Sequence, residues 1–168
     1  MIKKNYVKIN QYTRPGRKLH GVKGVVWHYT ATPNAPAINI RNYFNGTCIN
    51  EKRYAGCHIA VDWKEAIQLM PLDEVAFHAH DNNRCYPNEL KPNANYNTIA
   101  VEMCLDKAGK LTATTFQNAV KVGVELCKKF NLDPMKHFYR HYDITGKNCP
   151  AMWVSAPSEF KRFKEEVK

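Results

Sequence analysis

The stretch VKGVVWHY, Val22–Tyr29, is a short run of β-branched and aromatic residues, and this pattern predicts a buried strand. The stretch TIAVEMCL, Thr98–Leu105, has the same length and a similar character and predicts a second strand. Between the two, GCHIAVDWKEAIQLMP, Gly56–Pro71, predicts a hairpin that turns near Asp62–Glu65. The stretch HFYRH, His137–His141, predicts a further strand. These stretches supply the expected sheet.

Helical patterns lie between and after these strands. Apolar residues recur at i, i+3, i+4 and i+7 from Phe116 to Phe130, and Thr112 is a suitable N-cap for that helix. Thr32–Gly46 predicts a turn and then a short helix stopped by its glycine, and Pro157–Val167 predicts an amphipathic helix. This order of elements indicates an α/β fold, a central mixed β-sheet flanked by helices.

The stretch His80–Asn97 is crowded with asparagine and proline and predicts a long surface loop. Long loops in compact domains are often functional. The chain has 168 residues, which fits one ordinary domain, and it shows no internal repeat, low-complexity tract or interior linker. We therefore expect residues 1–168 to form a single domain.

The net charge of +10 makes a polyanion a possible partner, but the charge alone does not identify it. A basic surface attracts polyanions, so nucleic acid and anionic cell-wall polymer are two interpretations, and simple solvation of the surface is a third. The chain has no nucleic-acid-binding motif, and its aromatic residues do not interleave with a basic stripe, so we expect no nucleic-acid partner. No apolar run approaches the ~20 residues of a membrane helix, so we expect no membrane span.

The first residues, MIKKNYVKINQYT, are basic, but the apolar stretch of a secretory signal does not follow them. We therefore expect synthesis in the cytoplasm without a signal peptide. The six cysteines include no Cys-x-x-Cys pair, and a domain of this size rarely depends on disulfides. We expect these thiols to be reduced.

Three residues with metal-binding side chains occupy suitable positions. His28 and His141 each end a predicted strand, and their imidazoles converge if those strands are neighbours. A turn at Thr145–Gly146 returns Cys149 to the same end of the sheet. Two histidines and one cysteine would leave a fourth tetrahedral position for water, as in catalytic zinc sites. The alternative interpretations are a purely structural zinc and histidines with no metal.

Glu102 lies inside an apolar strand, where a carboxylate is costly to bury unless it is paired or functional. A carboxylate beside a zinc-bound water is the usual general base for amide hydrolysis. Lys147, two residues before Cys149, could direct a positive charge at a developing oxyanion. A solvated strand face for Glu102 and a solvated surface lysine are the alternatives.

Five stretches occur in a characteristic order, and these are VVWHYTA, AGCHIAVD, VAFHAH, NTIAVEMC and RHYDITGKNCP. Together they resemble the zinc N-acetylmuramoyl-L-alanine amidases of the type-2 amidase family, which includes phage endolysins and shares its fold with peptidoglycan recognition proteins. The resemblance extends from Val22 to Phe163. Its most specific part is the spacing RH-D-TGK-CP.

Carried over position by position, the resemblance implies one Zn²⁺ per chain held by His28, His141 and Cys149. It implies that Glu102 is the catalytic glutamate and Lys147 the catalytic lysine. Some relatives have a tyrosine where this chain has a cysteine. A role for that tyrosine is therefore absent here, and the expected catalytic residue is Glu102 instead. That cysteine is Cys57.

Three further residues have expected positions. His58 and His78 match positions that line the substrate groove in relatives, so we expect them in the groove wall, or alternatively in the core, and not on the metal. Asp143 is expected to hydrogen-bond within its own loop and to fix the shape of that loop.

The implied reaction is hydrolysis of the amide between N-acetylmuramic acid and L-alanine in bacterial peptidoglycan, which lyses the cell wall. The alternative is a non-catalytic peptidoglycan-binding module of the same fold. We expect a monomer that acts on the wall after release from the cell, as in phage lysis, although a cytoplasmic recycling amidase also fits. Residues 1–168 would be one catalytic domain. It could be excised from a longer endolysin with a wall-binding domain, or its own charge could suffice for adhesion to anionic wall polymers.

Overall fold

The structure is a computed structural model that describes residues 2–168. The described residues form a six-stranded sheet with the order β1-β4-β3-β5-β2-β6. Neighbouring strands are parallel except in the β3–β4 hairpin, which turns through Asp62–Glu65 as predicted. The expected α/β fold with a central mixed sheet is confirmed. The strands are β1 (Lys3–Lys4), β2 (Gly24–Pro33), β3 (Ile59–Val61), β4 (Ala66–Gln68), β5 (Thr98–Leu105) and β6 (Phe138–Arg140).

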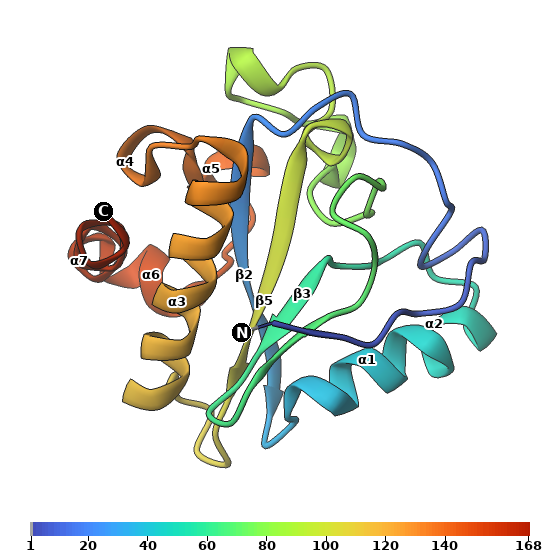
Figure 1. The fold of residues 1–168 in the computed structure, drawn as a ribbon, viewed down its shortest axis with the longest axis horizontal. Coiled ribbons are helices and arrows are strands. Elements are labelled where there is room, and N and C mark those ends of the chain that lie inside the picture. Colours follow the sequence, from blue (N-terminus) through green and yellow to red (C-terminus); the bar gives the residue numbers. More distant parts are fainter. Residues whose placement is uncertain (1) are drawn as a thin grey trace.

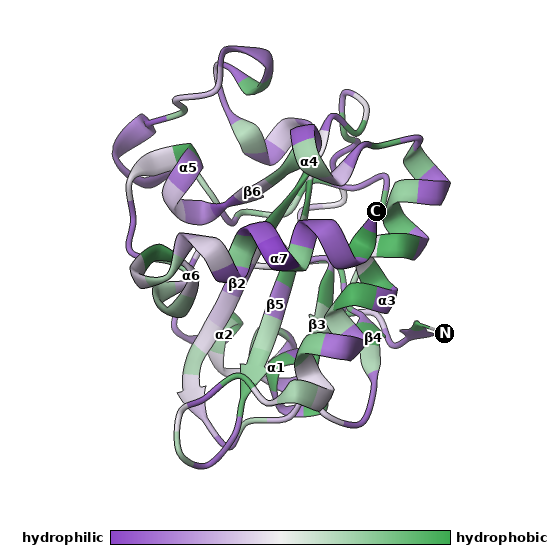
Figure 2. Ribbon diagram, turned by 90° about the vertical axis from the view of Figure 1, so that its left-hand side faces the viewer, coloured by the Kyte–Doolittle hydropathy of each residue, from purple (hydrophilic) through white to green (hydrophobic). Residues whose placement is uncertain are grey.

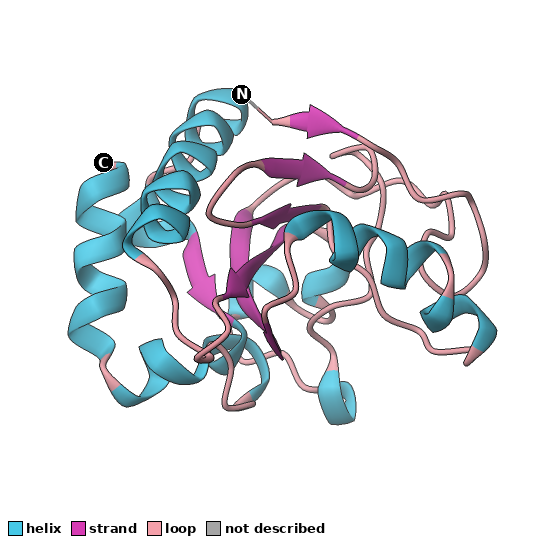
Figure 3. Cartoon of the chain, turned by 90° about the horizontal axis from the view of Figure 1, so that it is seen from below, coloured by secondary structure: helices cyan, strands magenta, loops and turns pink. Residues whose placement is uncertain are grey.

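Helices cover both faces of the sheet (Figure 1). On one face lie α1 (Ala37–Asn45) and α2 (Thr47–Asn50). On the other lie α3 (Ala113–Phe130), α6 (Ala151–Ser155) and α7 (Pro157–Val167). Two short helices precede and follow β6, and these are α4 (Pro134–His137) and α5 (His141–Thr145). The view from below in Figure 3 shows the strands lying between the helical layers.

Successive side chains of a strand point to opposite faces of the sheet, so each face has its own hydrophobic core. Trp27 of β2 contacts Phe163 of α7 with ring centroids 4.6 Å apart, and Phe116 of α3 packs in the same cluster. On the opposite face, Ala100 of β5 belongs to a cluster with Phe44 of α1. Each large apolar side chain buried in this way contributes roughly 1.5–3 kcal/mol.

The apolar residues of α7 recur along a mainly hydrophilic helix (Figure 2), as its amphipathic pattern predicts. The predicted N-cap of α3 is also confirmed, because Thr112 Oγ1 accepts a hydrogen bond of 3.0 Å from Thr115 N. Within residues 2–168, no helix combines the length and the apolar character needed to cross a membrane.

Several element boundaries differ from the sequence prediction. The strand predicted from the run Val22–Tyr29 begins two residues later, at Gly24, and continues as β2 to Pro33. The stretch His80–Asn97, predicted as one loop, contains three short 3₁₀ helices at Asp81–Asn83, Asn88–Leu90 and Ala94–Tyr96. The sequence did not indicate β1, α2, α4 or α6, because elements of two to five residues are too short to show a periodic pattern.

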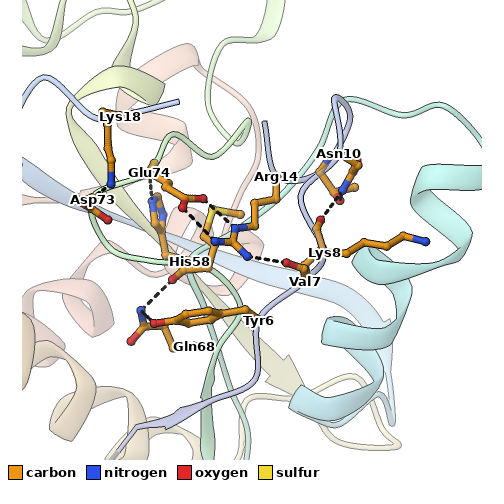
Figure 4. Close-up of polar contacts among 12 residues, drawn as sticks. Tyr6, Val7, Lys8, Asn10, Arg14, Lys18, His58, Gln68, Asp73 and Glu74 are labelled. Carbon is orange, nitrogen blue, oxygen red and sulfur yellow. Dashed lines mark hydrogen bonds and ion pairs between the residues drawn. The ribbon is translucent and has the colours of Figure 1, made fainter. Parts of the chain in front are cut away.

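His58 is fully buried and does not line a groove, so the groove-wall placement is wrong for this residue and the core alternative holds. Ala100 N donates to Nδ1 at 2.9 Å, so the imidazole hydrogen is on Nε2 and is donated to the Glu74 carbonyl at 2.8 Å. The Glu74 carboxylate accepts two hydrogen bonds from Arg14, at 2.8 and 2.9 Å (Figure 4). His58 therefore links β5 to Glu74, in the segment that follows β4. The ring can make both hydrogen bonds only when it is neutral.

His58 is expected to make the fold sensitive to acid. Burial lowers the pKa of His58 from 6.5 to about 4. The unfolded chain therefore binds a proton at a pH where the folded chain does not, and stability present above pH 6.5 is lost as the pH falls toward 4. The expected loss from this one group is about 2 kcal/mol at pH 5. Urea unfolding between pH 7 and pH 5 measures it.

The matched comparison is between His58→Gln, which cannot titrate, and His20→Gln at an exposed histidine. The free energy of unfolding of His58→Gln should fall less steeply with acid than that of wild type, whereas His20→Gln should keep the wild-type slope. Equal slopes for His58→Gln and wild type would show that this histidine is not the group responsible.

Candidate metal centre and catalytic cleft

Neighbouring strands bring the predicted site residues to one place. In the β2–β5 pair, His28 is the register partner of Glu102. In the β2–β6 pair, Trp27 is the partner of Arg140, so the next residues along, His28 and His141, lie side by side. Because side chains alternate along a strand, Trp27 enters the core and His28 points to the opposite face.

The stretch RHYDITGKNCP, expected as a loop, contains the helix α5. His141 is therefore the first residue of that helix and not the end of a strand, which corrects the prediction. The Asp143 carboxylate accepts hydrogen bonds from Arg140 N at 2.8 Å and Arg140 Nη2 at 2.6 Å, so the prediction of a local role for Asp143 is confirmed.

Gly146 ends α5 in the left-handed region with φ of +85°, a conformation that favours glycine. The chain reverses there, and Tyr142 N donates to the Cys149 carbonyl at 2.9 Å. The turn expected at Thr145–Gly146 thus returns Cys149 to the start of the helix, beside His141.

The donor atoms of His28, His141 and Cys149 all lie within 4.8 Å of one another. His28 Nδ1 is 3.8 Å from Cys149 Sγ, and the two imidazole centroids are 4.7 Å apart. All three side chains are buried. Donors at this spacing can hold one metal ion between them.

The electrostatics of the three donors suit a cation. Burial lowers the pKa of His28 well below its usual value and also lowers that of His141, although Asp81 opposes the second shift. Burial raises the pKa of the Cys149 thiol to about 12. The imidazoles therefore keep their lone pairs, and the thiol must release its proton when a metal binds. Two neutral imidazoles and a buried thiol are a donor set that fits zinc.

Two residues outside the donor set orient the histidines. Asp81 Oδ2 accepts a short hydrogen bond from His141 Nε2 and another of 3.0 Å from Thr145 Oγ1. His78 Nδ1 lies 3.1 Å from His28 Nε2. Each of the two histidines therefore has its Nε2 occupied and its Nδ1 free for the donor cluster. Such outer partners fix the ring orientation and raise ligand basicity.

Sequence reasoning missed Asp81 and the contact made by His78. Asp81 belongs to an asparagine-rich stretch without periodicity, and its distance of 60 residues from His141 offers no sequence signal. His78 was expected in the groove wall, and it does line the cleft.

Glu102 and Lys147 line the same cleft of ≈390 Å³ as the three donors. Burial raises the pKa of Glu102 to about 7, and Lys147 acts in the opposite direction. Among the described residues, nothing donates a hydrogen bond to the buried Glu102 Oε2. A partly buried carboxyl with a near-neutral pKa and a free oxygen is suited to accept and return a proton.

Lys147 is 57% exposed, and its Nζ lies 3.6 Å from Asp81 Oδ1. It also borders a second hollow of ≈490 Å³ that shares Arg53, Phe77 and His78 with the cleft. The two hollows therefore adjoin, which provides room for an extended substrate. Cys57, at the place where some relatives have tyrosine, is fully buried and does not line the cleft.

A family model described as N-acetylmuramoyl-L-alanine amidase matches residues 17–152. The chain is 56% identical to the N-acetylmuramoyl-L-alanine amidase CwlL of Bacillus licheniformis, over 98% of this chain and 46% of the relative. It is 51% identical to the N-acetylmuramoyl-L-alanine amidase BlyA of Bacillus subtilis (strain 168), over 98% and 46% respectively. The chain thus spans less than half the length of these curated relatives.

The fold is similar to that of PlyL, with a TM-score of 0.81, 28% identity, and coverage of 100% of this chain and 97% of that one. The matched residues 17–152 include every residue of the donor cluster together with Glu102 and Lys147. Sequence and structural similarity therefore cover the same part of the molecule, and the chain belongs to the N-acetylmuramoyl-L-alanine amidase family.

Proposed function

We propose that this chain is a zinc-dependent N-acetylmuramoyl-L-alanine amidase. It hydrolyses the amide between the lactyl carboxyl group of N-acetylmuramic acid and the amino group of L-alanine in bacterial peptidoglycan. The observation that supports this most is the cleft in which His28, His141 and Cys149 lie with Glu102 and Lys147. The names of the relatives at 51–56% identity point to the same reaction.

His28, His141 and Cys149 would hold the zinc ion through two imidazole nitrogens and one sulfur. Three protein ligands leave a coordination position open, as catalytic zinc sites do. A bound zinc ion supplies a Lewis acid for the scissile carbonyl and lowers the pKa of water toward ~7. Asp81 and His78 occupy the Nε2 atoms of the two imidazoles and would thereby keep their Nδ1 atoms available to the ion.

Glu102 is the proton carrier of the proposed reaction. Its pKa of about 7 leaves part of the population ionised near neutrality, ready to take a proton from the attacking water. The same carboxyl then gives that proton to the alanine nitrogen, so the leaving group departs as an amine. The apolar strand around Glu102 is what raises its pKa, because burial disfavours the charged carboxylate.

Lys147 places a positive charge at the edge of the cleft, where the tetrahedral oxyanion would form. Its contact with Asp81 restrains the flexible side chain near that position. Loss of one donor of this kind costs on the order of 10²–10³ in rate in acyl-transfer enzymes.

Residues 1–168 are proposed as one catalytic domain that acts in the bacterial cell wall. Peptidoglycan is the proposed partner, and the net charge of +10 favours adhesion to anionic wall polymers as well. The same fold without cutting would be a peptidoglycan-binding module, but such a module has no need of Glu102 beside the donor cluster.

Mass spectrometry of purified walls after digestion tests the proposal. The expected products are peptides with a new L-alanine amino terminus and glycan strands with free lactyl carboxyl groups. Both should disappear when the enzyme is treated with a zinc chelator and return when zinc is restored. Wall binding without either product would identify a binding module, and cleavage at a glycosidic bond would contradict the proposed reaction.

A further inference from the structure

A line of buried and partly buried hydrogen bonds runs from the backbone of the long loop to the donor cluster. Thr98 Oγ1, at the first residue of β5, donates to the Ala94 carbonyl at 2.7 Å. The same oxygen lies 3.1 Å from His78 Nε2. His78 Nδ1 lies 3.1 Å from His28 Nε2, and His28 Nδ1 faces Cys149 Sγ.

The direction of each bond in this line follows from the first one. A threonine hydroxyl has a single hydrogen, and the Ala94 carbonyl can only accept, so Thr98 must accept from His78. The hydrogen of a neutral His78 is therefore on Nε2, and its Nδ1 is bare. That bare nitrogen accepts the Nε2 hydrogen of His28, which leaves His28 Nδ1 as a lone pair.

We propose that Ala94, Thr98 and His78 form a tautomer relay, in which the loop carbonyl of Ala94 determines which nitrogen of His28 is presented to the metal. His78 and Thr98 are positioning residues in this proposal, because neither belongs to the donor cluster. The inference rests on the metal centre proposed above, and it assigns a purpose to one part of the stretch His80–Asn97.

The loop also holds His78 by its backbone. Asn95 Oδ1 accepts from His78 N at 3.0 Å and from Ala79 N at 2.8 Å. Asn95 is buried and follows Ala94 directly in the 3₁₀ helix Ala94–Tyr96. One turn of the loop therefore fixes both the position of His78 and, through Thr98, the direction of its hydrogen bonds.

A wrong tautomer would have a specific cost. If His28 carried its hydrogen on Nδ1, that hydrogen would point at the donor cluster and would have to move before a metal could bind. Thr98→Val keeps the shape of the side chain but removes the hydroxyl, so His78 Nε2 loses its acceptor. Thr98→Ser keeps the hydroxyl and is the matched control.

Long-range ¹H–¹⁵N NMR of the metal-free wild-type protein reads the tautomers directly and needs no variant. Both His28 and His78 should carry their hydrogen on Nε2. A hydrogen on Nδ1 of either ring would overturn the relay. This result is independent of whether zinc binds, so it separates failure of the relay from failure of the proposed metal centre.

Zinc affinity, measured by competition with a chromophoric chelator, gives the second readout. Thr98→Val and His78→Leu should weaken binding of Zn²⁺ by about 10–100-fold. Thr98→Ser should stay close to wild type, and His78→Asn should recover most of the loss, because its side-chain oxygen can accept from His28. Wild-type affinity in both Thr98→Val and His78→Leu would contradict the proposal, as would equal losses in Thr98→Val and Thr98→Ser.

Discussion

Replacement of Glu102 by glutamine should lower the rate of peptidoglycan hydrolysis by about 10²–10⁴-fold, the contribution typical of a general acid–base group. The amide has nearly the same shape as the carboxyl group, but it cannot carry a proton from water to the leaving amine. Because Glu102 is not one of the three donors, the variant should bind as much zinc as wild type. Turbidity loss of wall suspensions measures the rate, and elemental analysis measures the zinc.

The control is Glu165→Gln on α7, a remote and exposed carboxylate that forms a surface ion pair with Lys161. That variant should hydrolyse walls at the wild-type rate. Full activity in Glu102→Gln would remove the glutamate from the mechanism. A loss of zinc together with activity would instead mean that Glu102 helps to hold the metal.

Replacement of Cys149 by serine should remove zinc from the protein and abolish activity with it. A serine hydroxyl is a much weaker zinc donor than a thiolate, and only two histidines would remain. Loss of a donor should therefore cost more than the roughly 10–100-fold in affinity that loss of an outer partner costs. Zinc content after dialysis against a weak chelator is the measurement.

Cys127→Ser is the matched control, because this half-buried cysteine lies on α3, outside the donor cluster. It should keep one zinc ion per chain. A full zinc content in Cys149→Ser would show that the ion is held elsewhere or by a different set of residues.

Much of the fold was predictable because apolar residues recur with the period of each element. The β-branched run that begins at Val22 and the apolar run Thr98–Leu105 became the central strands β2 and β5. The i, i+3, i+4 pattern from Phe116 to Phe130 became the long helix α3. Short elements such as β1 and α4 depend on tertiary contacts, so no local pattern indicates them.

The candidate site was predictable to the extent that its residues are unusual for their positions. Glu102 interrupts an apolar strand, and Cys149 follows a turn that ends in glycine. Asp81 has no such mark, since an aspartate in a polar loop is ordinary, and only the folded chain brings it to His141. The sequence does not distinguish His58 from His78, but His58 is buried in the core and His78 lines the cleft.

His28, His141 and Cys149 are proposed to bind one zinc ion and to leave a coordination position open. X-ray absorption at the zinc edge of the wild-type protein is the decisive experiment. We expect one zinc ion per chain with two imidazole nitrogens at about 2.0–2.1 Å, one sulfur at about 2.3 Å and a further light atom from solvent. A zinc shell without sulfur, or one filled by four protein ligands, would refute this coordination.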